Sequence, residues 1–356
     1  MSNASSHGKK GRIQEQLNDA QILFDEADDV AYQPTRYKKK LQIYTLSPSG
    51  FVQNPEFLER AIENLKQSSV KVTVDKAALR QDMRFGGDDE DRLAAIARAA
   101  RHRSGIVMPT RGGYGLSRIL HRIDWKLIER NPKRYVGFSD FTAFNLALLA
   151  KTGMSSFTGP NLLDFGKDNV DELTYDIFLE VMHGELEILS FESEGSDAVD
   201  TRGTLWGGNL AMVASLIGTP YMPKIKNGIL FLEDVGEYPF RVERMLAQLL
   251  HAGIFAKQKA IVLGHFTGYK LSANDKGFDM PEVVRWLRAN TGLPVVTGLP
   301  YGHGDVRVTL PIGKKVGLAT ESGMAYLVID EHHHDHDHDH DHDHHGHDHD
   351  HREHRH

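Results

Sequence analysis

The strongest candidate for a catalytic nucleophile is Ser139, which stands in the segment V-G-F-S-D-F-T. Because the sequence contains no cysteine, the remaining nucleophiles are serine, threonine, lysine, a carboxylate or metal-activated water. Ser139 lies between an apolar run that predicts a strand and one that predicts a helix, a turn that exposes a hydroxyl beside helix amide groups. Only half of the G-x-S-x-G pattern is present, since Gly137 fills the first glycine position and Phe141 the second. The alternative is that Ser139 or Asp140 simply caps the helix.

A second candidate is the glycine-rich segment R-G-G-Y-G at residues 111–115. Adjacent glycines let the backbone approach a ligand closely and leave amide groups free to donate to an anion or oxyanion. The segment is neither G-x-G-x-x-G nor a P-loop, so it gives little support for nucleotide binding. An ordinary tight turn is the alternative.

A candidate acid is Glu233, which lies at the end of the apolar strand pattern G-I-L-F-L-E-D. Such an acid is a sheet-end cap, an ion-pair partner for a residue such as Arg241 or Arg244, or a catalytic carboxylate. Asp234 and Glu237 compete with it for the catalytic role.

His303 is the candidate base, in the glycine-flanked segment L-P-Y-G-H-G-D. Its main rival is His265, which ends a predicted strand. Ser139, an acid and then a histidine follow one another in the order that some serine hydrolases use. Trp206, in L-W-G-G-N, could wall a ligand cleft between domains, although plain core packing is the simpler interpretation.

The elements that must position these residues begin with an alternation of strands and helices. Strands are predicted at 41–46, 71–74, 105–108 and 134–138, and helices near 55–67, 91–100 and 141–150. This rhythm predicts a parallel sheet covered on both faces, with ligands beyond the carboxyl ends of its strands. Residues 111–115 and Ser139 both fall at those ends.

The second half predicts a mixed α/β unit with a smaller sheet. Its strands are expected at 203–209, 228–234, 260–266 and 294–298 and in a pair from Val306, with helices at 240–251 and near 281–288. A polar stretch at 184–201 marks the boundary. We therefore expect a flexible arm at 1–38 with one short helix, domains at 39–190 and 191–330, and a disordered tail at 331–356.

Composition excludes several classes of function. The chain has 356 residues and a formal charge of −7, most of it in residues 332–356, which hold two arginines against eight acids. The remaining body is nearly neutral, so nucleic acid is a poor partner. No apolar run reaches the roughly 18 residues of a membrane helix, and the N-terminus lacks a secretion signal. The tail predicts weak zinc or nickel binding, separate from hydrolysis, at His332, His333, His334, His336 and His338.

Five segments together resemble the serine LD-carboxypeptidases, the muramoyl-tetrapeptide carboxypeptidase family. They are R-G-G-Y-G, G-F-S-D-F-T, G-T-L-W-G-G-N-L, L-E-D-V-G-E-Y-P-F-R-V-E-R-M-L and L-P-Y-G-H-G, and the resemblance covers about residues 41–325. It implies a flavodoxin-like or amidotransferase-like N-terminal α/β domain and a smaller, mixed α/β C-terminal domain of swivelling type. It also implies a cytoplasmic, homodimeric enzyme of murein recycling that removes the terminal D-alanine from murein tetrapeptides and needs no cofactor.

The resemblance assigns roles to individual residues. Ser139, Glu233 and His303 form the catalytic triad, with His303 as the general base and acid and Glu233 orienting it. The amides of Gly112, Gly113 and Asp140 bind the oxyanion. A last group is counted as substrate-binding: Arg111, for the terminal carboxylate, with Tyr114, Trp206 and Asn209.

Two other functions stay open at this point. A serine peptidase of the microcin-immunity type would cleave peptidyl-nucleotide toxins with the same kind of site. A non-catalytic metal-binding protein would use only the tail, with the folded body as a scaffold.

Overall fold

The first of two sheets is parallel and has four strands. The computed structural model describes residues 40–329, so the predicted arm and tail lie outside the described residues. The strand order is β2-β1-β3-β4, and every neighbouring pair is parallel. The strands are β1 (Leu41–Leu46), β2 (Val70–Val74), β3 (Ile106–Pro109) and β4 (Arg134–Tyr135). β1 and β3 are buried almost throughout, as parallel strands covered on both faces must be.

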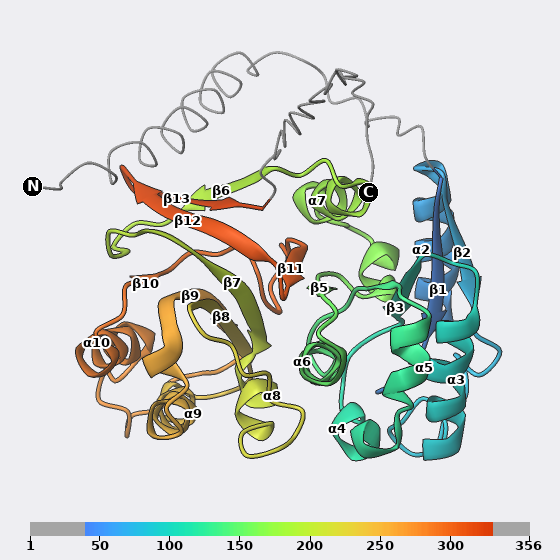
Figure 1. Ribbon diagram of the computed structural model, residues 1–356, viewed down its shortest axis with the longest axis horizontal. Coiled ribbons are helices and arrows are strands. Elements are labelled where there is room, and N and C mark those ends of the chain that lie inside the picture. Colours follow the sequence, from blue (N-terminus) through green and yellow to red (C-terminus); the bar gives the residue numbers. More distant parts are fainter. Residues whose placement is uncertain (1–39, 330–356) are drawn as a thin grey trace, which may run out of the picture.

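The helices of the first half of the chain surround this sheet (Figure 1). They are α2 (Pro55–Gln67), α3 (Asp89–Arg101), α4 (Leu116–Ile119), α5 (Trp125–Arg130), α6 (Phe141–Thr152) and α7 (Glu172–His183), with 3-10 turns η1 (Leu120–Arg122) and η2 (Leu162–Gly166). Of these, α2, α3 and α5 lie beside the sheet (Figure 1). The start of α2 follows from Pro55 in its first turn, where a missing N–H costs nothing. In α3 the side chain of Asp88 caps the N-terminus by accepting from Asp91 N–H.

The second sheet has seven strands in the order β10-β9-β8-β7-β12-β13-β6. The strands are β6 (Ile188–Glu192), β7 (Asp200–Asn209), β8 (Gly228–Val235), β9 (Gln258–Thr267), β10 (Val295–Val296), β12 (Lys315–Glu321) and β13 (Met324–Val328). β7 to β10 pair in parallel, whereas β12, β13 and β6 are antiparallel. The accompanying helices are α8 (Leu210–Ser215), α9 (Pro239–His251) and α10 (Met280–Thr291), with the turn η3 (Phe255–Lys257).

The α/β architecture, with a parallel first sheet and a mixed second one, is confirmed, but two details were predicted wrongly. The second sheet is larger than the first, because three antiparallel strands extend the parallel set. One of them, β6, lies inside the polar stretch at 184–201, and its pairing with β13 places it in the second sheet. The predicted boundary at 190/191 therefore cuts through this strand.

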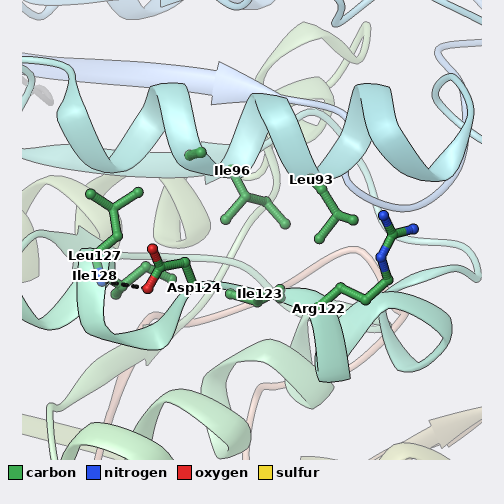
Figure 2. A pocket seen from close by; sticks show the side chains of 8 residues that line it. Leu93, Ile96, Arg122, Ile123, Asp124, Leu127 and Ile128 are labelled. Carbon is green, nitrogen blue, oxygen red and sulfur yellow. Dashed lines mark hydrogen bonds between the residues drawn. The ribbon is translucent and has the colours of Figure 1, made fainter.

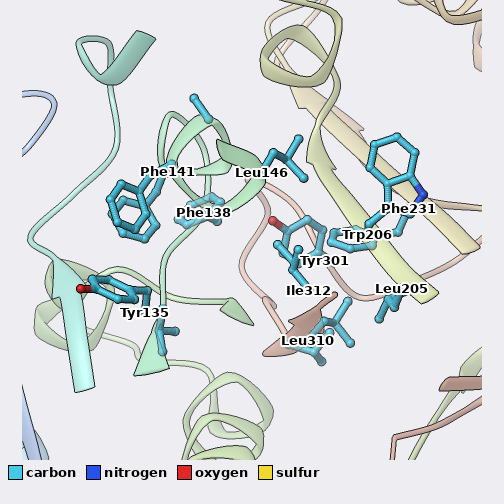
Figure 3. Close-up of a cluster of buried hydrophobic side chains, with 14 of the residues drawn as sticks. Tyr135, Phe138, Phe141, Leu146, Leu205, Trp206, Phe231, Tyr301, Leu310 and Ile312 are labelled. Carbon is cyan, nitrogen blue, oxygen red and sulfur yellow. The ribbon is translucent and has the colours of Figure 1, made fainter. Parts of the chain in front are cut away.

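A buried helix and a small strand pair join the two parts. β5 (Ser156–Thr158) pairs antiparallel with β11 (Leu310–Ile312), so a strand from each half of the chain contributes. Every side chain of α6 from Phe141 to Leu148 is buried, as expected for a helix that is apolar on all sides. Figure 3 shows aromatic and aliphatic side chains gathered around this junction, including Phe138, Trp206 and Tyr301.

One small cavity lies away from the predicted site residues. It is mainly apolar and lies between α3 and the segment leading into α5, lined by Leu93, Ile96 and Ile123 among others (Figure 2). None of the candidate catalytic residues lines it. Among residues 40–329, no helix combines the length and apolar character needed to cross a membrane.

Candidate active site

Ser139 occupies a strained turn between β4 and α6. Its φ of 61° lies in the left-handed region, which non-glycine residues adopt rarely and mostly at functional turns. Gly137 is needed here, because a Cβ would come within 2.7 Å of Pro109 and 2.8 Å of the Phe141 ring. Gly137 therefore leaves room for the ring of Phe141, which stands where the G-x-S-x-G pattern has its second glycine.

The helix-capping alternative for this turn does not hold for Asp140. The N-terminus of α6 has no side-chain cap, and the Asp140 carboxylate points elsewhere. It accepts from Ser49 Oγ at 2.6 Å and from the Leu116 amide at 2.9 Å. Burial raises the pKa of Asp140, with these two hydrogen bonds opposing the rise.

Glu233 and His303 form a hydrogen-bonded pair. Glu233 is completely buried at the end of β8, and its Oε2 accepts from His303 Nδ1 at 2.8 Å. Its Oε1 accepts from Asn209 Nδ2 at 3.1 Å. Since a carboxylate only accepts, Nδ1 carries the proton and Nε2 keeps its lone pair. This is the tautomer a general base needs.

The other candidates for acid and base have different partners. The Asp234 carboxylate accepts from Asn209 and from the Ala211 amide, and burial raises its pKa. Glu237 pairs with Arg241 at the surface. The backbone amide of His265 donates to Tyr301 O, and no carboxylate within residues 40–329 pairs with its ring. Glu233 is therefore the acid that faces a histidine.

Phe138 brings the histidine loop beside the nucleophile turn. The rings of Phe138 and His303 have centroids 4.8 Å apart, and Phe138 directly precedes Ser139. The guanidinium carbon of Arg307 lies 3.6 Å from the same ring centroid. The turn that holds Ser139, from the first half of the chain, thus lies beside the loop of His303, from the second.

The loop at residues 111–115 closes over Ser139. A Cβ on Gly112 would lie 2.8 Å from Ser139 Oγ, so only glycine permits this approach. Gly113 has a φ of 116°. Within residues 40–329, the amides of Gly112, Gly113 and Asp140 have no hydrogen-bond acceptor. Unpaired amides at a nucleophile are suited to stabilising an oxyanion.

Two of the residues predicted to bind substrate have other partners. The role predicted for Trp206 is wrong, and Asn209 holds two carboxylates. Trp206 is 1% exposed and donates from Nε1 to Gln258 Oε1 at 2.8 Å, so it packs in the core of the second sheet. Asn209 is buried and holds the carboxylates of Glu233 and Asp234. Tyr114 is 42% exposed.

Arg307 is a buried residue of the site that the sequence analysis missed. Its Nε donates to Gly302 O at 2.8 Å and its Nη1 pairs with Asp164 Oδ2 at 3.0 Å. It therefore ties the loop of His303 to η2. The available signal was a single charged residue in the run V-R-V-T-L.

No group of three or more His, Asp or Glu side chains in the described part of the chain is placed to hold a metal ion. The tail histidines lie outside the described residues.

The chain matches two domain families. Residues 43–159 match the LD-carboxypeptidase N-terminal domain, and residues 202–318 match the LD-carboxypeptidase C-terminal domain. These ranges contain Ser139, Glu233 and His303.

Individual relatives agree with this result. The "Probable murein peptide carboxypeptidase" of Bacillus subtilis is 29% identical over 303 residues, covering 83% of this chain and 94% of the relative. A solved muramoyltetrapeptide carboxypeptidase from Oxalobacter formigenes is 43% identical with a TM-score of 0.76, covering 80% of this chain and 97% of that one. The microcin C7 self-immunity protein of Escherichia coli is 27% identical over 294 residues, covering 73% of this chain and 84% of the relative.

Proposed function

Because the chain belongs to the LD-carboxypeptidase family, we propose that it removes the terminal D-alanine from murein tetrapeptides, with Ser139, His303 and Glu233 as its catalytic triad. The reaction serves the recycling of cell-wall peptides in the cytoplasm. The observation that carries the proposal is the hydrogen bond from His303 to buried Glu233, beside a turn that holds Ser139 at a φ of 61°. Predicted homodimer formation is a separate proposal, which sedimentation velocity tests.

The proposed reaction begins when His303 Nε2 takes the proton of Ser139 Oγ as that oxygen bonds to the scissile carbonyl carbon. The carbonyl oxygen becomes an oxyanion, which the amides of Gly112, Gly113 and Asp140 stabilise by on the order of 3 kcal/mol each. Collapse breaks the C–N bond, and His303 gives its proton to the departing amine of D-alanine. Water then hydrolyses the acyl-enzyme, with His303 as base, and restores Ser139.

A carboxypeptidase must also bind the terminal carboxylate of its substrate, and we propose Arg111 for this role. Within residues 40–329 its guanidinium has one acceptor, Phe51 O, at 3.4 Å. The next residue, Gly112, contacts Ser139. Arg111→Lys is expected to raise KM for the tetrapeptide more than it lowers kcat, since a bidentate cation becomes a point charge.

The likeness to the microcin self-immunity protein favours cleavage of peptidyl-nucleotide toxins as the second candidate function. The same triad would act on the amide of such a toxin. The two functions differ in the leaving group, which is D-alanine for the murein peptide.

Mass spectrometry of both substrate classes, each incubated with purified protein, tests the proposal. We expect loss of one D-alanine from the tetrapeptide with wild type and with a chain shortened to end at Asp330, with or without a chelator. Ser139→Ala and His303→Ala should abolish it, whereas Glu237→Gln, which changes a carboxylate paired with Arg241, should not. Cleavage of the toxin alone would establish the second candidate. Cleavage of neither substrate would refute both assignments.

A further inference from the structure

Two buried side chains of opposite charge, those of Arg92 and Asp140, have no role in the reaction described above, which uses only the backbone amide of Asp140. Arg92 lies in α3, where its side chain is 0% exposed, and Asp140 is 2% exposed. Burying a charge is costly unless hydrogen bonds satisfy it. Arg92 Nη2 pairs with Asp89 in the same helix, and the remaining hydrogen bonds of the two side chains indicate which loops they hold.

Both side chains bind the same two loops. Arg92 Nη1 donates to Pro48 O and to Gly115 O, at 2.9 Å each. Asp140 Oδ2 accepts from Ser49 Oγ and from the Leu116 amide. The cation thus binds residues 48 and 115 through their carbonyls, and the carboxylate binds the following residue of each loop through a donor.

The glycines of the loops permit this contact. Gly115 has a φ of 154°, and a Cβ there would lie 2.5 Å from Arg92 Nη1. The Gly50 amide also donates to Gly112 O at 3.2 Å. The loops at 47–50 and 111–116 are therefore held together as one unit, and Gly112 is the part of that unit that touches Ser139.

We propose that Arg92 and Asp140 are positioning residues that clamp the loops at 47–50 and 111–116 together, so that the amides of Gly112 and Gly113 are fixed at the oxyanion before the substrate arrives. Oxyanion donors are effective because they need no reorganisation during the reaction. Hydrogen bonds to ionised groups are stronger than neutral ones, which suits a clamp on a glycine-rich loop.

The proposal deepens the proposed function, because it rests on Ser139 as nucleophile, but it does not depend on the substrate. We therefore test it first by the rate at which a fluorophosphonate labels Ser139. In this reaction Oγ bonds to phosphorus, fluoride leaves, and the phosphoryl oxygen occupies the place of the oxyanion.

The variants are Asp140→Asn, which keeps the shape and removes the charge, Asp140→Ala, and Arg92→Lys. At temperatures where each variant is folded by circular dichroism, we expect labelling to slow in the order wild type, Asp140→Asn, Asp140→Ala. For Asp140→Ala and Arg92→Lys we expect a fall of about 10- to 100-fold, since loss of one oxyanion donor costs about 10²- to 10³-fold. With the tetrapeptide, kcat should fall in parallel while KM changes less than about threefold.

Asp197→Asn is the matched control. The Asp197 carboxylate also accepts two hydrogen bonds, from Arg288 Nε and the Val295 amide, but in the second sheet. It should lower stability without changing the labelling rate. Wild-type labelling rates in Asp140→Ala and Arg92→Lys would overturn the proposal, as would equal slowing in Asp197→Asn or a wild type that is not labelled. A wild type that is labelled but releases no D-alanine would refute the substrate assignment alone.

Discussion

Replacement of Glu233 by glutamine should reverse one hydrogen bond without changing the shape of the site. Glu233 accepts from His303 Nδ1 on one oxygen and from Asn209 Nδ2 on the other. The Asn209 Oδ1 already accepts from the Met212 amide at 3.2 Å, so Asn209 can present only its donor to residue 233. In Glu233→Gln, the new side chain therefore turns its carbonyl to Asn209 and its NH₂ group to His303.

The consequence is the wrong tautomer of His303. An NH₂ group only donates, so His303 Nδ1 must accept and the ring proton moves to Nε2. Nε2 then cannot take the proton of Ser139. In a serine triad this exchange of carboxylate for amide lowers kcat about 10⁴-fold, equivalent to about 5 kcal/mol in the transition state.

The assay is the rate of D-alanine release from the tetrapeptide, measured beside thermal unfolding. Glu237→Gln makes the same chemical change at a surface carboxylate and should retain the wild-type rate. The double variant Glu233→Gln with Asn209→Ala removes the donor that orients the amide, and part of the rate should return. A Glu233→Gln protein within tenfold of wild type would refute this reasoning.

Three further predictions concern the remaining buried groups. Burial acts to raise the pKa of Asp75, but its hydrogen bonds, Arg98's among them, hold that pKa below its ordinary value. Asp75→Asn should therefore lower the free energy of unfolding in urea by about 2 kcal/mol at pH 7, and the difference should shrink as pH falls below about 3.9 through the depressed folded-state pKa. Trp206→Phe should cost about 1–3 kcal/mol of stability with kcat and KM unchanged, whereas a cleft wall would alter KM. Arg307→Lys keeps the charge but frees the loop of His303, so kcat should fall about tenfold at constant KM in steady-state assays.

Local signals were sufficient for most elements of the fold. The helix predicted near 55–67 is α2, which begins at Pro55 and buries Leu58, Ala61 and Leu65. The strand expected at 134–138 is only two residues long, followed by an isolated bridge at Val136, and the chain turns at Ser139. Local sequence cannot show that the residues of β6 pair with β13, more than 130 positions later, and so the size of the second sheet was underestimated.

Some residues of the site were also predictable from local sequence, and others were not. Ser139, Glu233 and His303 were identified from strand ends, a glycine-flanked loop and the resemblance. Trp206 packs in the core, the simpler of its two interpretations, and not at a cleft. Gly207 lets β7 approach β8, since a Cβ there would overlap Phe231 O. Arg92 was missed because two of its acceptors, the carbonyls of Pro48 and Gly115, lie on distant loops that only the folded structure brings together, although its ion pair with Asp89 is local.

The most direct test of the central claim is to trap the covalent intermediate. Wild-type protein mixed with a murein tetrapeptide, quenched in acid within milliseconds and digested, is analysed by mass spectrometry. We predict that the peptide containing Ser139 gains the mass of the substrate acyl group without D-alanine, and that Ser139→Ala shows neither this adduct nor D-alanine release. An adduct on another residue, or release by Ser139→Ala at more than about one hundredth of the wild-type rate, would contradict the account.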